Sequence, residues 1–149
     1  MKLIANKKAY LNYEILDTFN AGLELFGFEV KSIRGRQGSL EGARVVIRGG
    51  EAFLVGASIP PYQQANTPKG YEPERTRRLL LTRKEIGKLA GSERTKGLTM
   101  VPLSVYNARR KLKLEFALVR GKKKHDKRES LKKKQAKRDM ERAIKRKAR

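Results

Sequence analysis

The side chains best placed to do chemistry in this chain lie in one run, Arg120-Gly-Lys-Lys-Lys-His-Asp-Lys-Arg128, which holds the only histidine. Cationic side chains at this density neutralise phosphates, and an imidazole can stack on an unpaired base while it forms a hydrogen bond. No nucleophile or paired acid stands beside His125, so the run lacks the partners of acid–base catalysis. It predicts binding to a polyanion, and the chain is expected not to be an enzyme.

The composition points to the same kind of partner. The 149 residues include 37 Lys and Arg against 15 Asp and Glu, a formal net charge of +22. Self-repulsion of this size favours a polyanionic partner, with nucleic acid ahead of an anionic membrane surface. No apolar run approaches the ~18 residues of a membrane-spanning helix. Residues 1–8 show no signal-peptide apolar region, so a cytoplasmic protein is expected.

Metal and cofactor chemistry finds few ligands here. The chain has no cysteine and a single histidine, which excludes thiolate sites and histidine clusters. The acids are scattered and lack the spacing of a metal-dependent nuclease. No metal and no cofactor are therefore expected.

The charge divides the chain into two parts. Residues 120–149 hold 16 of the 37 basic and 4 of the 15 acidic side chains, so they carry +12 of the +22. With isolated apolar residues such as Leu131, Met140 and Ile144, this stretch cannot bury enough surface to offset its ordering entropy. We expect a folded RNA-binding domain over 1–120 and a basic tail over 121–149. The tail is expected to be disordered alone and helical inside an RNA-walled channel, although a non-specific basic arm would have a similar composition.

The elements that must position these charges are mostly strands. Alternating and apolar runs bounded by turn residues predict strands at 13–19 (continued by 21–26), 43–48, 51–59, 78–81, 98–106 and 111–119. Gly49-Gly50 is a two-residue hairpin signal, and Pro102 predicts an edge or a bulge. In 111–119, Leu112, Leu114, Phe116 and Leu118 share one face.

Helices are expected to be short and few. Thr82 and Glu85 form a capping box that opens a helix ending at Gly91. One or two helical turns are expected over 29–34, and Asn6 is a candidate cap for another turn. About six short strands with two to three short helices predict a mainly β fold, a small antiparallel oligonucleotide-binding-like (OB-like) β-barrel, closed or partly open, with a basic C-terminal tail.

Several motifs, taken in order and spacing, resemble one known family. They are Ala21-Gly22, Glu29-Val-Lys-Ser-Ile-Arg34, Arg77-Arg-Leu-Leu-Leu81, Lys96-Gly-Leu-Thr-Met-Val-Pro-Leu103 and Gly121-Lys-Lys-Lys-His-Asp-Lys-Arg128. From about Ile4 to its end, the chain is similar to the SsrA-binding protein family, also called small protein B, the bacterial partner of transfer-messenger RNA. The family's OB-like barrel agrees with the fold expected from the residues.

The resemblance implies a role in ribosome rescue by trans-translation. The body would bind the tRNA-like domain of transfer-messenger RNA, and the complex would enter a stalled ribosome with elongation factor Tu and GTP. The tail would occupy the small-subunit decoding centre and the empty mRNA channel. The free protein is expected to be a monomer without a membrane partner.

The candidate contact residues fall into two sets. The RNA-binding set of the body is Asn6, Lys7, Asn20, Gly22, Lys31, Ser32, Arg34, Arg75, Arg77, Arg78, Leu80, Thr82, Arg120, Lys122 and Lys123. The ribosome-binding set of the tail is Lys124, His125, Asp126, Lys127, Arg128, Lys132, Lys133, Ile144 and Lys145.

The chain departs from the family pattern at three body positions. Asn20 stands where the family usually has glutamate, Thr82 where Asn or His is common, and Asn107 where a second aromatic is usual. Near Gln135-Ala136 a frequent tryptophan is absent.

Simpler interpretations remain open for single residues and for the whole chain. Arg77 and Arg78 could be solvated strand-end charges, and Glu29 could simply favour a helix dipole. The alternative function is that of a general OB-fold RNA-binding or ribosome-associated protein without specificity for transfer-messenger RNA, which would bind many RNAs alike.

Overall fold

Strands make up most of the folded body. The structure is a computed structural model that describes residues 2–63, 65, 67–122 and 124–147. Its elements are β1 (Lys2–Ala5), α1 (Lys7–Asn12), β2 (Tyr13–Leu23), α2 (Gly27–Arg34), β3 (Arg44–Arg48), β4 (Glu51–Val55), β5 (Arg77–Leu80), α3 (Arg83–Glu93), β6 (Leu98–Ala108), β7 (Lys111–Gly121) and α4 (Lys124–Lys147).

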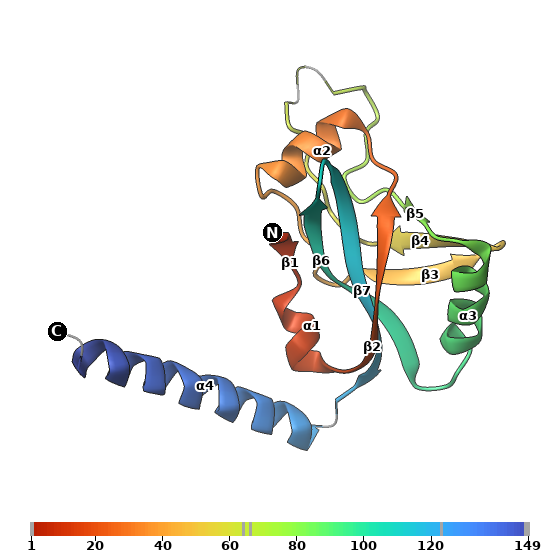
Figure 1. The fold of residues 1–149 in the computed structure, drawn as a ribbon. Coiled ribbons are helices and arrows are strands. Elements are labelled where there is room, and N and C mark those ends of the chain that lie inside the picture. The colour runs from red at the N-terminus through yellow and green to blue at the C-terminus, as the bar shows by residue number, and fades with distance from the viewer. Residues whose placement is uncertain (1, 64, 66, 123, 148–149) are drawn as a thin grey trace.

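The strands form one antiparallel sheet in the order β1-β6-β7-β2-β5-β4-β3 (Figure 1). The sheet curls so that β3 packs across β6. The mainly β, OB-like prediction is confirmed in its partly open form. The described residues add a strand that was not predicted, β1, which pairs with β6.

Turn and bulge signals are confirmed at the expected places. Gly49 and Gly50 join β3 to β4 with φ of 58° and 74°, values that glycine adopts without strain. The predicted segments 13–19 and 21–26 merge into the single strand β2, which ends at Leu23. Pro102 lies at a register shift between β6 and β7, so it marks a bulge.

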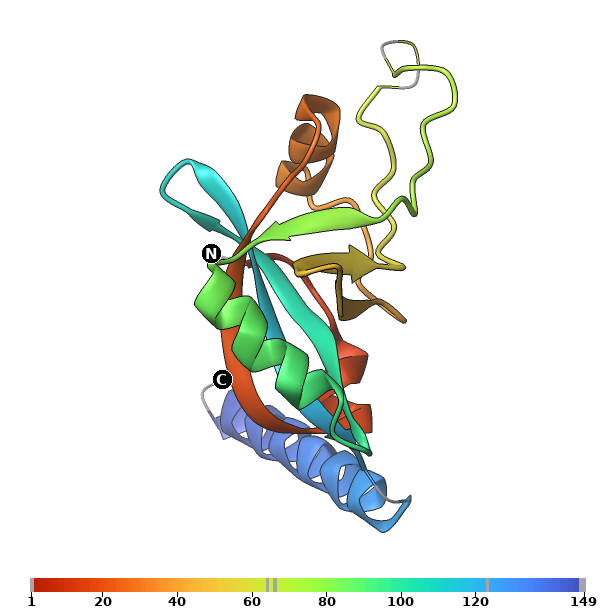
Figure 2. The ribbon, with the colours of Figure 1, turned by 90° about the vertical axis from the view of Figure 1, so that its right-hand side faces the viewer.

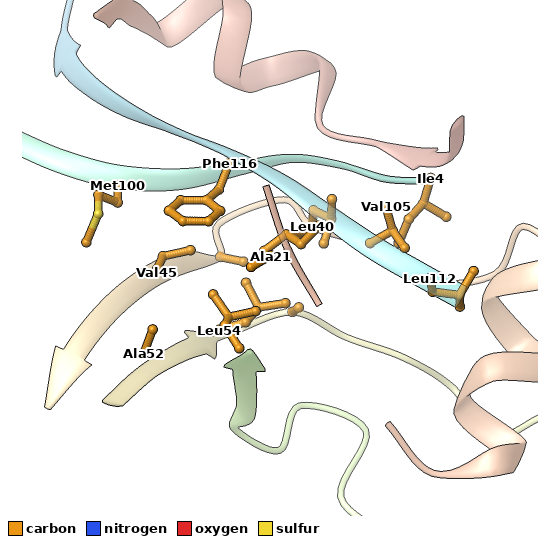
Figure 3. Close-up of a cluster of buried hydrophobic side chains, with 14 of the residues drawn as sticks. Ile4, Ala21, Leu40, Val45, Ala52, Leu54, Met100, Val105, Leu112 and Phe116 are labelled. Atoms are coloured by element: carbon orange, nitrogen blue, oxygen red, sulfur yellow. The ribbon is translucent and has the colours of Figure 1, made fainter. Parts of the chain in front are cut away.

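The core follows from the alternation of the strands. Leu112, Leu114 and Phe116 of β7 are buried in one cluster with residues of the other strands. Figure 3 shows Leu112 and Phe116 pointing into this cluster. A smaller apolar cluster lies under α1 and contains Ala9, Val101, Leu103, Ala117 and Val119. Together these clusters hold the sheet as one rigid platform for surface residues.

The predicted helices form, and their ends and caps differ in detail from the prediction. Thr82 and Glu85 make the predicted capping box, and α3 runs two residues beyond Gly91 to Glu93. Asn6 precedes α1, but its side chain does not cap the helix; its Nδ2 donates to Pro102 O at 2.9 Å instead. Helix α2 covers the predicted helical turns and begins two residues earlier, at Gly27.

Helix α4 leads away from the body beyond α1 (Figure 1). It covers most of the tail, and the tail's disorder in the free protein and its helical form on the ribosome both stay predictions. Among the described residues, no helix is both long enough and apolar enough to span a membrane.

Candidate nucleic-acid interface

An open groove of about 1400 Å³ lies between the sheet and α3. Residues 20–22 of β2, 78–80 of β5, the β3–β4 turn and one side of α3 line it. Figure 2 views the molecule from the side of α3, which lies in front of the sheet. A strand platform with a helix at its side gives RNA a concave surface of fixed shape.

The alternation of β5 decides which side chains face this groove. Arg77 and Leu79 are buried, while Arg78 and Leu80 are exposed. Leu80 is 51% exposed and pairs with Gly22 across the β2–β5 ladder. The groove therefore includes an apolar side chain beside a bare backbone, which suits close approach by a ribose or an unstacked base.

Cations line the same groove, and some already have partners. Arg78 lies 3.2 Å from Glu51, and Arg48 lies 2.6 Å from Glu93. Among the described residues, no ion pair is recorded for the other three basic residues of the groove, which are Arg83, Arg94 and Lys113. These three can neutralise phosphates without first breaking an ion pair.

Thr82 lines the groove, but its side chain caps the N-terminus of α3. Its hydroxyl donates to Glu85 Oε1 at 2.8 Å and accepts from the Glu85 N–H at 3.2 Å. Hydrogen bonds from the Thr82 hydroxyl and N–H lower the pKa of the Glu85 carboxyl. With its hydrogen already donated, Thr82 can offer RNA only an acceptor lone pair.

A buried ion cluster supports β5 from behind. Glu29 and Arg77 are both 0% exposed, and Arg77 donates to Glu29 Oε2 from Nε at 2.9 Å and from Nη2 at 2.7 Å. The remaining Arg77 N–H groups reach Tyr71 Oη and the carbonyls of Ala57, Pro73 and Arg75. The guanidinium therefore has no donor left for RNA.

Arg75 completes this cluster from the surface side. It donates to both Glu29 oxygens and lies 4.2 Å from the centre of the Phe26 ring. Burial alone would raise the pKa of Glu29, but hydrogen bonds from Arg75, the Phe26 N–H, Arg77 and Tyr71 outweigh it and lower the pKa. Burial and the neighbouring Glu29 raise the pKa of Tyr71.

The side chains of three predicted RNA contacts lie inside the protein, and these contacts stay predictions. Arg77 belongs to the buried cluster just described. Ser32 is 0% exposed on the inner side of α2. Asn6 is 7% exposed, and its amide ties the start of α1 to β6 through Pro102.

The other body candidates fall inside and outside the groove. Asn20, Gly22, Arg78, Leu80 and Thr82 come together in the groove. Arg75 belongs to the Glu29 cluster, and Lys31 lies 6.0 Å from the Tyr62 ring. The rest are dispersed: exposed Lys7 on α1, Arg34 bound to Arg110 O, Arg120 beside Glu14, and Lys122 bound to the carbonyls of Tyr10 and Asn12.

The tail candidates lie along α4. Arg128, Lys132, Lys133, Ile144 and Lys145 are exposed. Lys123 and the side chains of Lys124, His125, Asp126 and Lys127 lie outside the described residues.

Sequence reasoning missed part of the groove. Lys113 lies on β7 opposite Gly22, and Arg48 precedes the β3–β4 turn. The alternation of β7 had already placed Lys113 on the outer face, so a signal for it existed. The strand order brings Arg48, Arg83 and Arg94 into the same groove as β2. No local pattern in the sequence indicates that these residues lie together.

Comparisons with known proteins bear on the whole chain. A family model described as "SmpB protein" matches residues 3–146. The SsrA-binding protein of Gloeothece citriformis is 50% identical over 146 residues, which cover 97% of this chain and 94% of that protein. The SsrA-binding protein of Mesoplasma florum is 51% identical, covering 92% and 89%.

A solved structure gives the same result for the fold. A chain described under "tmRNA-SmpB: a journey to the center of the bacterial ribosome" superposes with a TM-score of 0.69 at 36% identity. The match covers 88% of this chain and 95% of that chain.

Proposed function

The chain belongs to the SmpB family, and we propose that it binds the tRNA-like domain of transfer-messenger RNA and brings that RNA to stalled ribosomes in trans-translation. It acts as a binding protein in the cytoplasm, where translation takes place, and not as an enzyme. Delivery with elongation factor Tu and GTP is part of the proposal.

The observation that carries this proposal is the composition of the groove. An exposed leucine, Leu80, lies beside Gly22, and cations that include Arg83, Arg94 and Lys113 line the same groove. Structured RNA is recognised by shape, 2′-hydroxyls and unstacked bases, and phosphate contacts fix its orientation. The exposed leucine suits contact with an unstacked base or a ribose, and the cations suit contact with phosphates.

We propose a separate role for α4, the occupation of the decoding centre and the empty mRNA channel. Its 24 residues span roughly 36 Å at the rise of an α-helix. Met140 and Ile144, four residues apart, share one side of the helix, and the surrounding residues are mostly basic. Such a helix can place charge against ribosomal RNA along a narrow channel.

A competition experiment tests RNA selection. Full-length protein is mixed with labelled transfer-messenger RNA at physiological salt and titrated with total tRNA or with unlabelled transfer-messenger RNA. We expect transfer-messenger RNA to compete far better than total tRNA. Equal competition would support the alternative of a general RNA-binding protein.

The salt dependence of the same binding provides a second check. Affinity should fall as salt rises, and each phosphate neutralised should contribute roughly −0.7 to −0.9 to the slope of log affinity against log salt concentration. Replacing Lys113 with Gln should make that slope less steep by the contribution of about one phosphate contact. An unchanged slope would remove Lys113 from the interface.

A further inference from the structure

Asn20 and Tyr106 are joined across an intervening strand. Asn20 lies on β2 opposite Glu115 of β7, and Tyr106 lies on β6 opposite Lys113 of β7. The Tyr106 hydroxyl reaches over β7 and donates to Asn20 Oδ1 at 2.8 Å. The two residues are 86 positions apart in the chain.

In the structure the oxygen end of the Asn20 amide faces Tyr106, and the nitrogen end is free. An amide oxygen only accepts and an amide nitrogen only donates, whereas a tyrosine hydroxyl has one hydrogen to give. Among the described residues, Asn20 Oδ1 is the acceptor recorded for that hydrogen. With Oδ1 turned toward Tyr106, the Nδ2 group faces away, and no described residue accepts a hydrogen bond from it.

The free end of the amide belongs to the groove. Asn20 is exposed and lines the groove together with Gly22, Leu80 and Lys113. Leu80 and Lys113 line the same groove, so Nδ2 adds a hydrogen-bond donor to a surface that already carries a cation. A carboxylate at position 20 could only accept hydrogen bonds and would present the opposite polarity.

We propose that Tyr106 is a positioning residue that holds Asn20 with its amide N–H groups directed at the bound RNA. Position 20 then donates to an acceptor of the tRNA-like domain, either a phosphate oxygen or an acceptor atom of a base. The inference rests on the proposed function, because it concerns RNA held in the same groove.

The test compares the affinities of four variants for the isolated tRNA-like domain with that of the wild-type protein. We expect Asn20→Ala to bind about threefold to tenfold more weakly, the usual effect of losing one hydrogen bond. Asn20→Asp keeps the bond from Tyr106 but replaces the donor with a negative acceptor, so it should bind more weakly than Asn20→Ala. An Asn20→Asp variant that binds as tightly as wild type overturns the proposal.

A double-mutant cycle tests the role of Tyr106. Tyr106→Phe removes only the hydroxyl, and we expect about a twofold to fivefold loss of affinity because the amide is free to rotate. In the double variant with Asn20→Ala, Tyr106→Phe should cost nothing more, since it acts through Asn20. Additive losses would overturn the positioning role. Tyr10→Phe, on α1 outside the groove, is the matched control and should bind like wild type.

The salt dependence of the Asn20→Asp variant separates the two kinds of acceptor. Repulsion between Asp and a phosphate is screened, so the deficit of Asn20→Asp relative to Asn20→Ala should shrink as salt rises. Opposite a base acceptor the deficit should persist. A wild-type protein that fails to prefer transfer-messenger RNA contradicts the proposed function, whereas normal preference with unaffected variants contradicts this inference alone.

Discussion

Gly22 and Leu80 face each other as Cα partners across β2 and β5, and the leucine occupies the space that a side chain at position 22 would need. A Cβ on Gly22 would lie 3.3 Å from both Cβ and Cδ1 of Leu80. This is tighter than ordinary van der Waals contact. The glycine therefore determines where the exposed leucine lies in the groove.

Leu80→Ala should weaken binding of the tRNA-like domain about fivefold, because covering the exposed part of a leucine is worth about 1 kcal/mol. The free energy of unfolding of the Leu80→Ala variant should differ from that of the wild-type protein by less than about 0.5 kcal/mol, as expected for a surface substitution. Gly22→Ala should also weaken binding, because it displaces Leu80. Leu16→Ala, 40% exposed on β2 outside the groove, is the control for both measurements.

Glu29→Gln should destabilise the fold by about 3 to 5 kcal/mol, because it leaves the buried Arg77 guanidinium without its counter-charge. Chemical denaturation measures this loss. Glu41→Gln also removes one carboxylate from an ion pair, but that pair with Lys8 is exposed, so the cost should stay below about 1 kcal/mol. Equal costs for the two variants would contradict a special role of the buried cluster.

The stability of the protein should fall in acid through Glu29. Its pKa in the folded protein lies below the ordinary 4.5, so its contribution is complete above that value. The contribution is lost as the pH falls through the lowered pKa, where the folded state must also take up the proton. Denaturation curves should show the difference between wild type and Glu29→Gln shrinking as the pH is lowered below 4.5. A constant difference down to the acid limit would contradict this assignment.

Glu93 should hold α3 against the edge of the sheet. Its Oε2 accepts from the Ile47 N–H at 2.7 Å, and its Oε1 accepts from Arg48 Nη1 at 2.6 Å. Glu93→Ala should cost about 1.5 to 3 kcal/mol, the range for hydrogen bonds to a charged group, and should speed hydrogen exchange at the Ile47 amide. Arg48→Ala removes the ion pair and the hydrogen bond from Arg48 Nη1 to the Ile47 carbonyl, but it leaves the bond from the Ile47 N–H to Glu93, so exchange at the Ile47 amide should stay slow.

Deletion of residues 130–149 should separate RNA binding from ribosome rescue. It removes ten basic and two acidic side chains but none of the residues that line the groove. We expect a modest loss of affinity for transfer-messenger RNA and a near-complete loss of peptide tagging on stalled ribosomes in a reconstituted system. If affinity and tagging fell in proportion, the tail would be only an electrostatic anchor.

Local signals predicted most of the elements because their causes lie within a few residues. The capping box of Thr82 and Glu85, the Gly49-Gly50 turn and the bulge at Pro102 are each stabilised by neighbours in the chain. The strand β1 escaped prediction because its four residues carry too little pattern. It is a strand because β6 offers it a partner about 100 positions away.

The burial of Arg77 shows what local signals could not predict. Alternation along β5 could have placed Arg77 and Arg78 on opposite faces, but it could not say which face is the interior. Glu29, 48 residues away, decides that, since a buried arginine needs a buried counter-charge.

The sequence by itself determined the partition of charge, the two faces of β7, the helix cap and a family resemblance that the comparisons confirmed. Only the tertiary structure decided that Arg77 is internal, that Lys113 and Arg48 line the groove, and that Tyr106 orients Asn20. The physical reason is the range of the forces. Periodicity and capping act within a few residues, whereas the sheet order brings together side chains that are distant in the chain, such as Asn20 and Tyr106, which are 86 positions apart.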